Sequence, residues 1–195
     1  MTLDPRQLLY AYSQGIFPMA GEDGAILWYD PDPRAILPLK EFRVPRRLAR
    51  TVRQEPYEVR VNTALSDVIT YCAAPSPGRE QTWINPALIE AYTELHRLGF
   101  AHSVEAWQDG QLVGGLYGVA LNSLFAGESM FSRERDASKV ALVHLVRRLR
   151  QRGFLLLDIQ FLTDHLAQFG AIEIPRSQYK TRLQQAMLKP NRFDT

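Results

Sequence analysis

Residues 101–130, AHSVEAWQDGQLVGGLYGVALNSLFAGESM, contain the clearest secondary-structure pattern of the chain. It predicts three strands, at 101–108, 111–121 and 124–130. Asp109–Gly110 joins the first two strands, and Asn122–Ser123 joins the second to the third. Asp-Gly is a strong signal for a two-residue hairpin, because both residues tolerate positive φ. The stretch therefore predicts an antiparallel meander.

Helices and strands continue on both sides of the meander. A strand at 57–62 and helices at 64–74 and 85–99 precede it. A helix from Asp136 to about Arg152, a buried strand at 154–159, a short helix at 163–169, a strand at 171–174 and a last helix from Pro175 follow it. This order predicts an α/β (α+β) fold with a mixed sheet and flanking helices. Over residues 57–175 it resembles the GNAT fold of acyltransferases.

The first part of the chain predicts shorter elements. Asp4 and Pro5 open a helix that Gly15 ends, since Asp caps a helix start and Pro suits its first turn. Extended pieces follow at 26–29 and 35–39. Pro45 begins a second helix that reaches about Arg53.

Composition limits the class of protein. The chain has 195 residues, of which 46% are hydrophobic and 23% charged, as in ordinary globular proteins. No apolar run is long enough to cross a bilayer, and the first residues lack the layout of a secretory signal. The single cysteine, Cys72, excludes an internal disulfide. We therefore expect a cytoplasmic protein.

The charges are unevenly distributed although the net charge is only +2. Five arginines on residues 43–53, with no acid among them, share one face of the predicted helix: Arg43, Arg46, Arg47, Arg50 and Arg53. A second basic segment, 133–152, includes Arg133 and Lys139. Such segregation favours an anionic partner on one side of the molecule. The alternative is a solvated helix face.

The turn before the helix at 136–152 bears on cofactor use. An acetyl-CoA enzyme of this fold needs glycines there, so that backbone N–H groups can approach the pyrophosphate. The sequence instead reads RERDAS at 133–138, and Asp136 is expected to cap the helix and repel phosphate. Coenzyme A is therefore disfavoured.

Ordered sequence blocks point to one family. They are GIFP (15–18), WYDPDPR (28–34), TWI (82–84), HSVEAW (102–107), GGLYG (114–118), FAGESMFSR (125–133), ASK (137–139), DIQ (158–160) and GAIEIPR (170–176). Together they resemble the leucyl/phenylalanyl-tRNA–protein transferases over nearly the whole chain. This resemblance implies a small, reduced N-terminal domain (1–34) followed by a GNAT-like catalytic domain (35–195).

The resemblance also implies the reaction. Members transfer Leu, Phe or Met from aminoacyl-tRNA to acceptor proteins that begin with Arg or Lys, which marks them for degradation by the N-end rule pathway. No metal or other cofactor is implied, and we expect a monomer. Two alternatives remain: an acyl-CoA-dependent N-acyltransferase on the same fold, and a tRNA-binding module without catalysis.

Asp158 and Gln160 are the catalytic pair that the resemblance implies. They alternate on a predicted strand, which predicts that they share a face. Asp158 is expected to polarise Gln160, whose carbonyl oxygen holds the attacking amine. Removing Asp158 is expected to lower turnover with little effect on the fold. The alternative is an Asp and a Gln satisfied by neighbouring backbone groups.

Glu128 and several apolar residues are the expected substrate-binding set. Glu128 is expected beside the aminoacyl-adenosine or the acceptor's N-terminus, or alternatively in a salt bridge with an arginine such as Arg133. An apolar pocket for the amino acid side chain is expected from Met130, Leu116 and Leu145. Trp83 and Phe125 are expected to stack on the terminal adenine, with Trp28 as a competitor.

tRNA is expected to bind through the basic residues already named, because phosphate contacts do not depend on base sequence. One position departs from the family: Met19 stands where an aromatic residue is common after GIFP. His102, His144 and His165 show no ligand spacing with one another or with Cys72, so no metal site is predicted.

Overall fold

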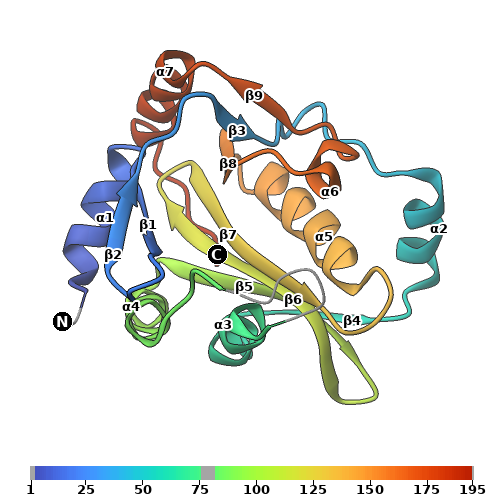
Figure 1. Ribbon diagram of the computed structural model, residues 1–195. Helices are drawn as coiled ribbons and strands as arrows, with labels where there is room; N and C mark the ends of the chain where they lie inside the picture. The colour runs from blue at the N-terminus through green and yellow to red at the C-terminus, as the bar shows by residue number, and fades with distance from the viewer. Residues whose placement is uncertain (1–2, 76–81, 195) are drawn as a thin grey trace.

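The computed structural model describes residues 3–75 and 82–194. Its core is a seven-stranded mixed sheet with the order β4-β5-β6-β7-β8-β3-β9, flanked by helices (Figure 1). The strands of this sheet are β3 (Arg34–Ile36), β4 (Glu58–Val61), β5 (Ala101–Gln108), β6 (Gln111–Leu121), β7 (Leu124–Ser132), β8 (Leu156–Gln160) and β9 (Ile172–Ile174). The predicted fold class, α/β with a mixed sheet, is confirmed.

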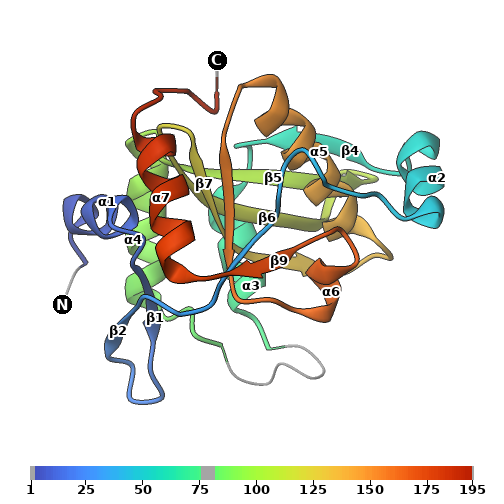
Figure 2. The same cartoon turned by 90° about the horizontal axis from the view of Figure 1, so that it is seen from above.

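The helices lie on both faces of the sheet and at its ends. They are α1 (Pro5–Ser13), α2 (Arg46–Gln54), α3 (Leu65–Ala73), α4 (Pro86–Arg97), α5 (Ala137–Gln151), α6 (Asp164–Ala167) and α7 (Arg176–Met187). One hydrophobic cluster joins α5 and α2 to the sheet, and a second joins α1, α3 and α4 to it. In both ribbon views α1, α4 and α7 gather at one end of the molecule and α2 at the other (Figures 1 and 2).

The predicted meander is confirmed. β5 pairs antiparallel with β6, and β6 with β7. Both residues of the Asp109–Gly110 turn have positive φ, as does Asn122 in the second turn. The third strand continues to Ser132, two residues beyond the predicted end.

β7 and β8 run parallel and are connected through α5, but they pair over three residues only. Leu124, Phe125 and Ala126 face Leu156, Leu157 and Asp158. β7 then continues for six residues and β8 for two without further pairing between them. The two strands therefore separate after Ala126 and Asp158, and a cavity opens between them.

The N-terminal residues form a hairpin and one strand of the main sheet. β1 (Phe17–Ala20) pairs with β2 (Ile26–Tyr29) in a separate two-stranded sheet. β3 lies between β8 and β9 in the sheet, although both of these strands come much later in the sequence. The division into domains at residues 34 and 35 stays a prediction.

Two local predictions are wrong. The predicted start of α2 at Pro45 is right to within one residue, but Arg43, which was expected on the arginine face of this helix, precedes it. Asp136 does not cap α5 with its side chain: its backbone is left-handed at φ 62°, which turns the carboxylate toward Arg47 and Lys139 instead. Among the helices that the structure describes, none has the length and apolar character needed to span a membrane.

Candidate active site

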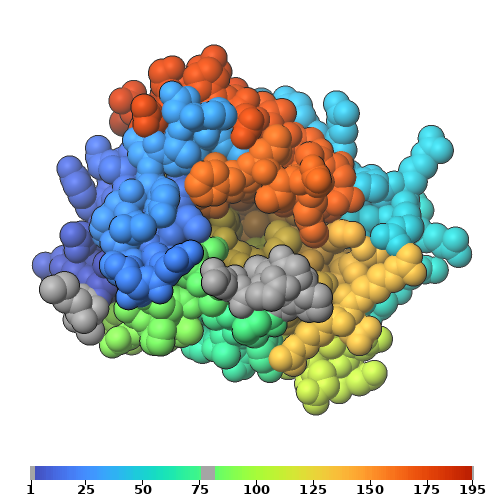
Figure 3. All heavy atoms as spheres, viewed as in Figure 1, coloured from blue at the N-terminus to red at the C-terminus, as the bar shows by residue number. Residues whose placement is uncertain are grey.

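A cavity of about 510 Å³ opens where β7 and β8 separate. Its walls come from β1, β6, β7, α5, β8 and the segment that follows β8, together with Trp83. The space-filling view shows a hollow here, between the blue N-terminal hairpin and the orange segment after β8 (Figure 3). Residues from seven parts of the chain thus enclose one space.

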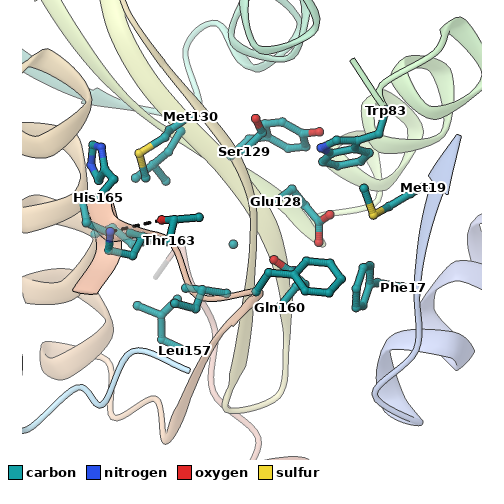
Figure 4. A pocket seen from close by; sticks show the side chains of 18 residues that line it. Phe17, Met19, Trp83, Glu128, Ser129, Met130, Leu157, Gln160, Thr163 and His165 are labelled. Atoms are coloured by element: carbon teal, nitrogen blue, oxygen red, sulfur yellow. Dashed lines mark hydrogen bonds between the residues drawn. The ribbon is translucent and has the colours of Figure 1, made fainter. Parts of the chain in front are cut away.

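The two ends of the cavity differ in chemistry. Met130 and His165 lie at one end, and Phe17, Met19 and Trp83 lie at the other (Figure 4). Further apolar lining comes from the side chains of Leu116, Leu142, Leu145, Leu157, Ile159 and Leu166. Glu128 and Gln160 lie between the two ends and come from different strands. The carboxylate of Glu128 and the amide of Gln160 therefore lie together near the middle of a channel whose lining is largely apolar.

Glu128 is held by two tyrosines. The hydroxyl of Tyr12 donates to its Oε1 at 2.7 Å, and that of Tyr92 donates to its Oε2 at 3.1 Å. Burial raises the pKa of Glu128 to about 7, although the two tyrosine hydrogen bonds favour the charged form and oppose the rise. Arg133, the alternative partner, does not pair with Glu128: its guanidinium carbon lies over Tyr71, 3.7 Å from the ring centroid.

Asp158 is buried behind the cavity wall and does not line the cavity. Arg34 donates to both carboxylate oxygens, at 2.9 and 2.6 Å, and both side chains are 1% exposed. Tyr179 donates its hydroxyl at 2.8 Å. Burial alone lowers the pKa of Arg34, but the Asp158 carboxylate outweighs it and the net pKa is raised. This buried pair is electrically neutral.

Asp158 reaches Gln160 through the backbone. The N–H of Gln160 donates to Asp158 Oδ1 at 3.0 Å, and the side-chain amide is not part of this contact. The predicted polarisation of that amide is therefore wrong. The backbone of Gln160 is left-handed at φ 60°, which interrupts strand alternation and lets its side chain line the cavity while Asp158 stays below.

The amide of Gln160 is one of three buried polar groups on the cavity wall that lack a hydrogen-bond partner among the described residues, together with the Tyr117 hydroxyl and His165 Nε2. The Nε2 atom of Gln160 is buried and has no hydrogen-bond partner among the residues described. A buried donor without a partner costs about 1–3 kcal/mol, so the site is better satisfied when a bound molecule supplies an acceptor. Figure 4 shows Gln160 close to Glu128 in the middle of the channel.

The other predicted substrate residues divide into two groups. Met130, Leu116, Leu145 and Trp83 line the cavity. Phe125 does not: it is fully buried, with its ring 5.3 Å from that of Phe193. No face of Phe125 is open to a base, so stacking on adenine is excluded for it. Trp28 lies on β2, 39% exposed and outside the cavity lining.

The basic residues cover the outside of α2 and the start of α5. Arg46, Arg47, Arg50 and Arg53 are exposed, while Leu48 and Val52 are buried on the opposite face of α2. Arg43 is exposed just before the helix. Asp136 pairs with Arg47 at 3.2 Å and with Lys139 at 2.9 Å, so these two charges are partly compensated.

Four residues of the site were not predicted from the sequence: Tyr12, Arg34, Tyr92 and Tyr179. Arg34 stands at the end of one of the family-like blocks, and that was the available signal. The tyrosines occupy the apolar faces of α1, α4 and α7, where an aromatic residue reads as ordinary core.

Comparison with known proteins identifies close relatives. The family described as "Leucyl/phenylalanyl-tRNA protein transferase" matches residues 36–184, and its N-terminal domain matches residues 1–32. Proteins named leucyl/phenylalanyl-tRNA--protein transferase are similar to this chain in Phenylobacterium zucineum strain HLK1 (59% identity over 97% of the chain and 87% of the relative) and Herpetosiphon aurantiacus (59% over 95% of each). A third, from Rhodopseudomonas palustris strain HaA2, is 56% identical over 98% of the chain and 87% of the relative.

Two solved structures with low sequence identity also align with the chain. The structure of L-PGS from Bacillus licheniformis aligns with 96% of this chain and 70% of that one, at 10% identity and a TM-score of 0.46. This likeness carries no argument about the site.

Proposed function

The chain belongs to the leucyl/phenylalanyl-tRNA protein transferase family, and from this membership we propose that it moves an amino acid from aminoacyl-tRNA to the N-terminus of an acceptor protein. The observation that carries the proposal is the two-ended cavity with Glu128 and the unpartnered Gln160 amide at its middle. An aminoacyl ester has the same layout: a side chain, a reactive carbonyl and a terminal nucleoside.

The apolar end suits the side chain of the transferred amino acid. Met130, Leu145 and Leu166 offer flexible, unbranched or γ-branched surface. Leu, Phe and Met extend beyond their Cβ before they widen, so they can enter such a pocket. Ile and Val branch at Cβ and would contact the wall near the reacting carbon. We therefore infer Leu, Phe and Met as donors.

Gln160 supports the reaction at the ester carbonyl. Its free Nε2 can donate to the carbonyl oxygen, which becomes negative as the amine attacks. One such donor contributes roughly 100- to 1,000-fold in rate in enzymes that stabilise an oxyanion. Its side-chain oxygen remains available to hold the incoming amine. Asp158 is a positioning residue: it accepts a hydrogen bond from the backbone N–H of Gln160 and so fixes the place of the Gln160 side chain.

The aromatic end suits the terminal adenosine. Trp83 presents an indole beside Phe17 and Met19, and an aromatic face stacks on any base. Met19 supplies a thioether to this end of the channel, so the platform rests on Trp83 and Phe17. The tRNA backbone then runs over α2 and the start of α5, where arginines lie exposed on one face.

The acceptor is inferred to begin with Arg or Lys, and the product to be marked for degradation by the N-end rule pathway. A carboxylate at the centre of the cavity, Glu128, favours a cationic group over a neutral or acidic one. We infer that the enzyme acts in the cytoplasm as a monomer.

The acyl-CoA alternative is disfavoured at the turn before α5. The carboxylate of Asp136 occupies the region where a pyrophosphate would need backbone N–H groups, and it already binds Arg47 and Lys139. The backbone N–H groups of Ala137 and Ser138 already donate to the carbonyl oxygen of Glu134 and to Ser132 Oγ, so they are not free to bind a pyrophosphate.

A transfer assay tests the proposal. Labelled Phe or Leu on tRNA is offered to matched acceptors that begin with Arg, Lys or Asp, with and without acetyl-CoA. We expect labelling of the Arg and Lys acceptors, none of the Asp acceptor, and no effect of acetyl-CoA. The proposal fails if the Asp acceptor is labelled equally, or if acyl transfer proceeds from acetyl-CoA and not from charged tRNA.

A further inference from the structure

Three oxygen-bearing groups form a closed ring on the cavity wall. The hydroxyls of Tyr12 and Tyr92 lie 2.7 Å apart, and each also contacts a different oxygen of Glu128, at 2.7 and 3.1 Å. Tyr12 comes from α1 and Tyr92 from α4, whereas Glu128 comes from β7. Both tyrosines are buried, and Glu128 borders the cavity.

The number of protons available to this ring depends on the ionisation of Glu128. An ionised carboxylate only accepts hydrogen bonds, and each tyrosine has one hydroxyl proton. Two protons then serve three close contacts, and one contact has no proton between its oxygens. A neutral carboxyl group adds the third proton: Glu128 donates to Tyr92, Tyr92 to Tyr12, and Tyr12 to Glu128. The ring therefore accommodates both states of Glu128, the neutral one with every contact satisfied.

The charges around Glu128 nearly balance. Besides the two tyrosines, the titratable groups that face it are Tyr117 from β6, Asp158 from β8 and Arg34 from β3. Asp158 raises the pKa of Glu128, and Arg34 lowers it. Because these two form their own ion pair, neither dominates, and burial together with the tyrosine bonds sets the balance. The resulting pKa of about 7 suits a group that gains and loses a proton near neutral pH.

We propose that Glu128 takes the proton from the acceptor's α-ammonium group, and that Tyr12 and Tyr92 are positioning residues that control how tightly it holds this proton. The inference rests on the proposed transferase function. It assigns proton transfer to Glu128, since the charge of Asp158 is already neutralised by Arg34 below the cavity wall.

The Glu128 carboxylate takes one proton from the α-ammonium group, which leaves a free amine. The amine nitrogen attacks the ester carbonyl carbon, a C–N bond forms, and the C–O bond to the terminal ribose breaks. A second proton leaves the nitrogen for the departing ribose oxygen, and the third stays on the new amide. Glu128 then releases its proton to water.

The pH profile of turnover tests the tyrosines. Tyr12→Phe and Tyr92→Phe each remove a donor that favours ionised Glu128, so the pKa of Glu128 rises. The acid limb of kcat against pH should move upward by about one pH unit in each variant, since a hydrogen bond to a charged group is worth about one pKa unit. Turnover on the alkaline plateau, where Glu128 is ionised in every variant, should fall much less than turnover within the shifted acid limb.

Tyr117→Phe is the matched control. Tyr117 is as buried as Tyr92 and packs against it at 5.4 Å between ring centroids, but among the described residues its hydroxyl has no hydrogen-bond partner. The acid limb of kcat against pH in Tyr117→Phe should coincide with that of the wild type. An equal shift in Tyr117→Phe, or no shift in either of the other two variants, overturns the proposal.

Glu128→Gln and a direct titration separate this inference from the proposed function. Glu128→Gln should lose the acid limb and turn over at least 100-fold more slowly on the plateau, in line with the usual size of general-base catalysis. An infrared difference titration of the unliganded enzyme against Glu128→Gln should show a carboxyl band that disappears near pH 7, and at higher pH in Tyr12→Phe. A band already lost well below this pH overturns the inference even if transfer is active. Absence of transfer at every pH contradicts the proposed function instead.

Discussion

Arg34 and Asp158 connect four parts of the chain at one buried point. Besides its two bonds to Asp158, Arg34 donates to the carbonyl oxygen of Gly15 at 2.8 Å. Its guanidinium lies over the rings of Phe17 and Tyr179, at 4.7 and 4.4 Å from their centroids. The pair thereby holds β3, β8, α7 and the end of α1 in one arrangement. The position of Gln160 depends on it through the backbone bond from Asp158.

Asp158→Ala should therefore destabilise the fold, contrary to the expectation from the sequence that the fold would hardly change. Removing one member of a buried ion pair leaves the other charge uncompensated, which costs about 3–5 kcal/mol. Urea unfolding of the purified protein measures this loss. Turnover should also fall, because Gln160 is no longer held.

Gln160→Ala is the control for that prediction. Its amide has no partner to lose among the described residues, so unfolding should shift by less than about 1 kcal/mol while turnover falls roughly 100-fold or more. The double variant Arg34→Met with Asp158→Asn should be more stable than the sum of the two single losses implies. An Asp158→Ala protein as stable as Gln160→Ala would show that the pair is not structural.

At the scale of elements, turns and charge patterns were predictable, and side-chain direction at strand ends was not. The Asp-Gly and Asn-Ser turns set the meander because positive φ restricts which residues fit. The positive φ of Asp136 and of Gln160 was not indicated by the sequence pattern. At Asp136, attraction to Arg47 and Lys139 won over capping, and at Gln160 the shift from strand alternation brought its amide into the cavity.

The arginine face of α2 carries a prediction at this scale. Arg46→Ala, Arg50→Ala and Arg53→Ala together remove three exposed charges and spare Arg47, which binds Asp136. If each contacts a phosphate, the slope of log affinity for tRNA against log salt should flatten by about two units. Filter binding across a salt series measures the slope.

A matched triple variant controls for net charge. Arg6, Arg97 and Arg182 are exposed on α1, α4 and α7, at the opposite end of the molecule from α2 (Figure 1). Changing them to Ala should leave the slope within about half a unit of the wild type. A slope that is flattened by the control and not by the α2 variant would move the tRNA to the other end of the molecule. Transfer from aminoacyl-adenosine, which lacks the tRNA body, should be the same in all three proteins.

At the scale of the whole molecule, the cavity is a product of topology. β3 enters the sheet between β8 and β9, the hairpin β1–β2 closes one end, and β7 separates from β8 after three paired residues. These features depend on contacts between segments far apart in sequence. Local sequence patterns therefore could not predict which tyrosines contact Glu128, or that Phe193 packs against Phe125. The family-like blocks did mark Glu128, Asp158, Gln160 and Trp83, and the structure brings these residues to one region.

The position of a bound donor can be measured in a structure of the protein with phenylalanyl-adenosine in which an amide replaces the ester. We predict that the phenylalanyl ring lies among Met130, Leu145 and Leu166, and that the adenine lies against Trp83. The carbonyl oxygen should lie within hydrogen-bond distance, about 3 Å, of Gln160 Nε2. A complex with the phenylalanyl ring at the Phe17 end, or with the carbonyl directed away from Gln160, would contradict the account.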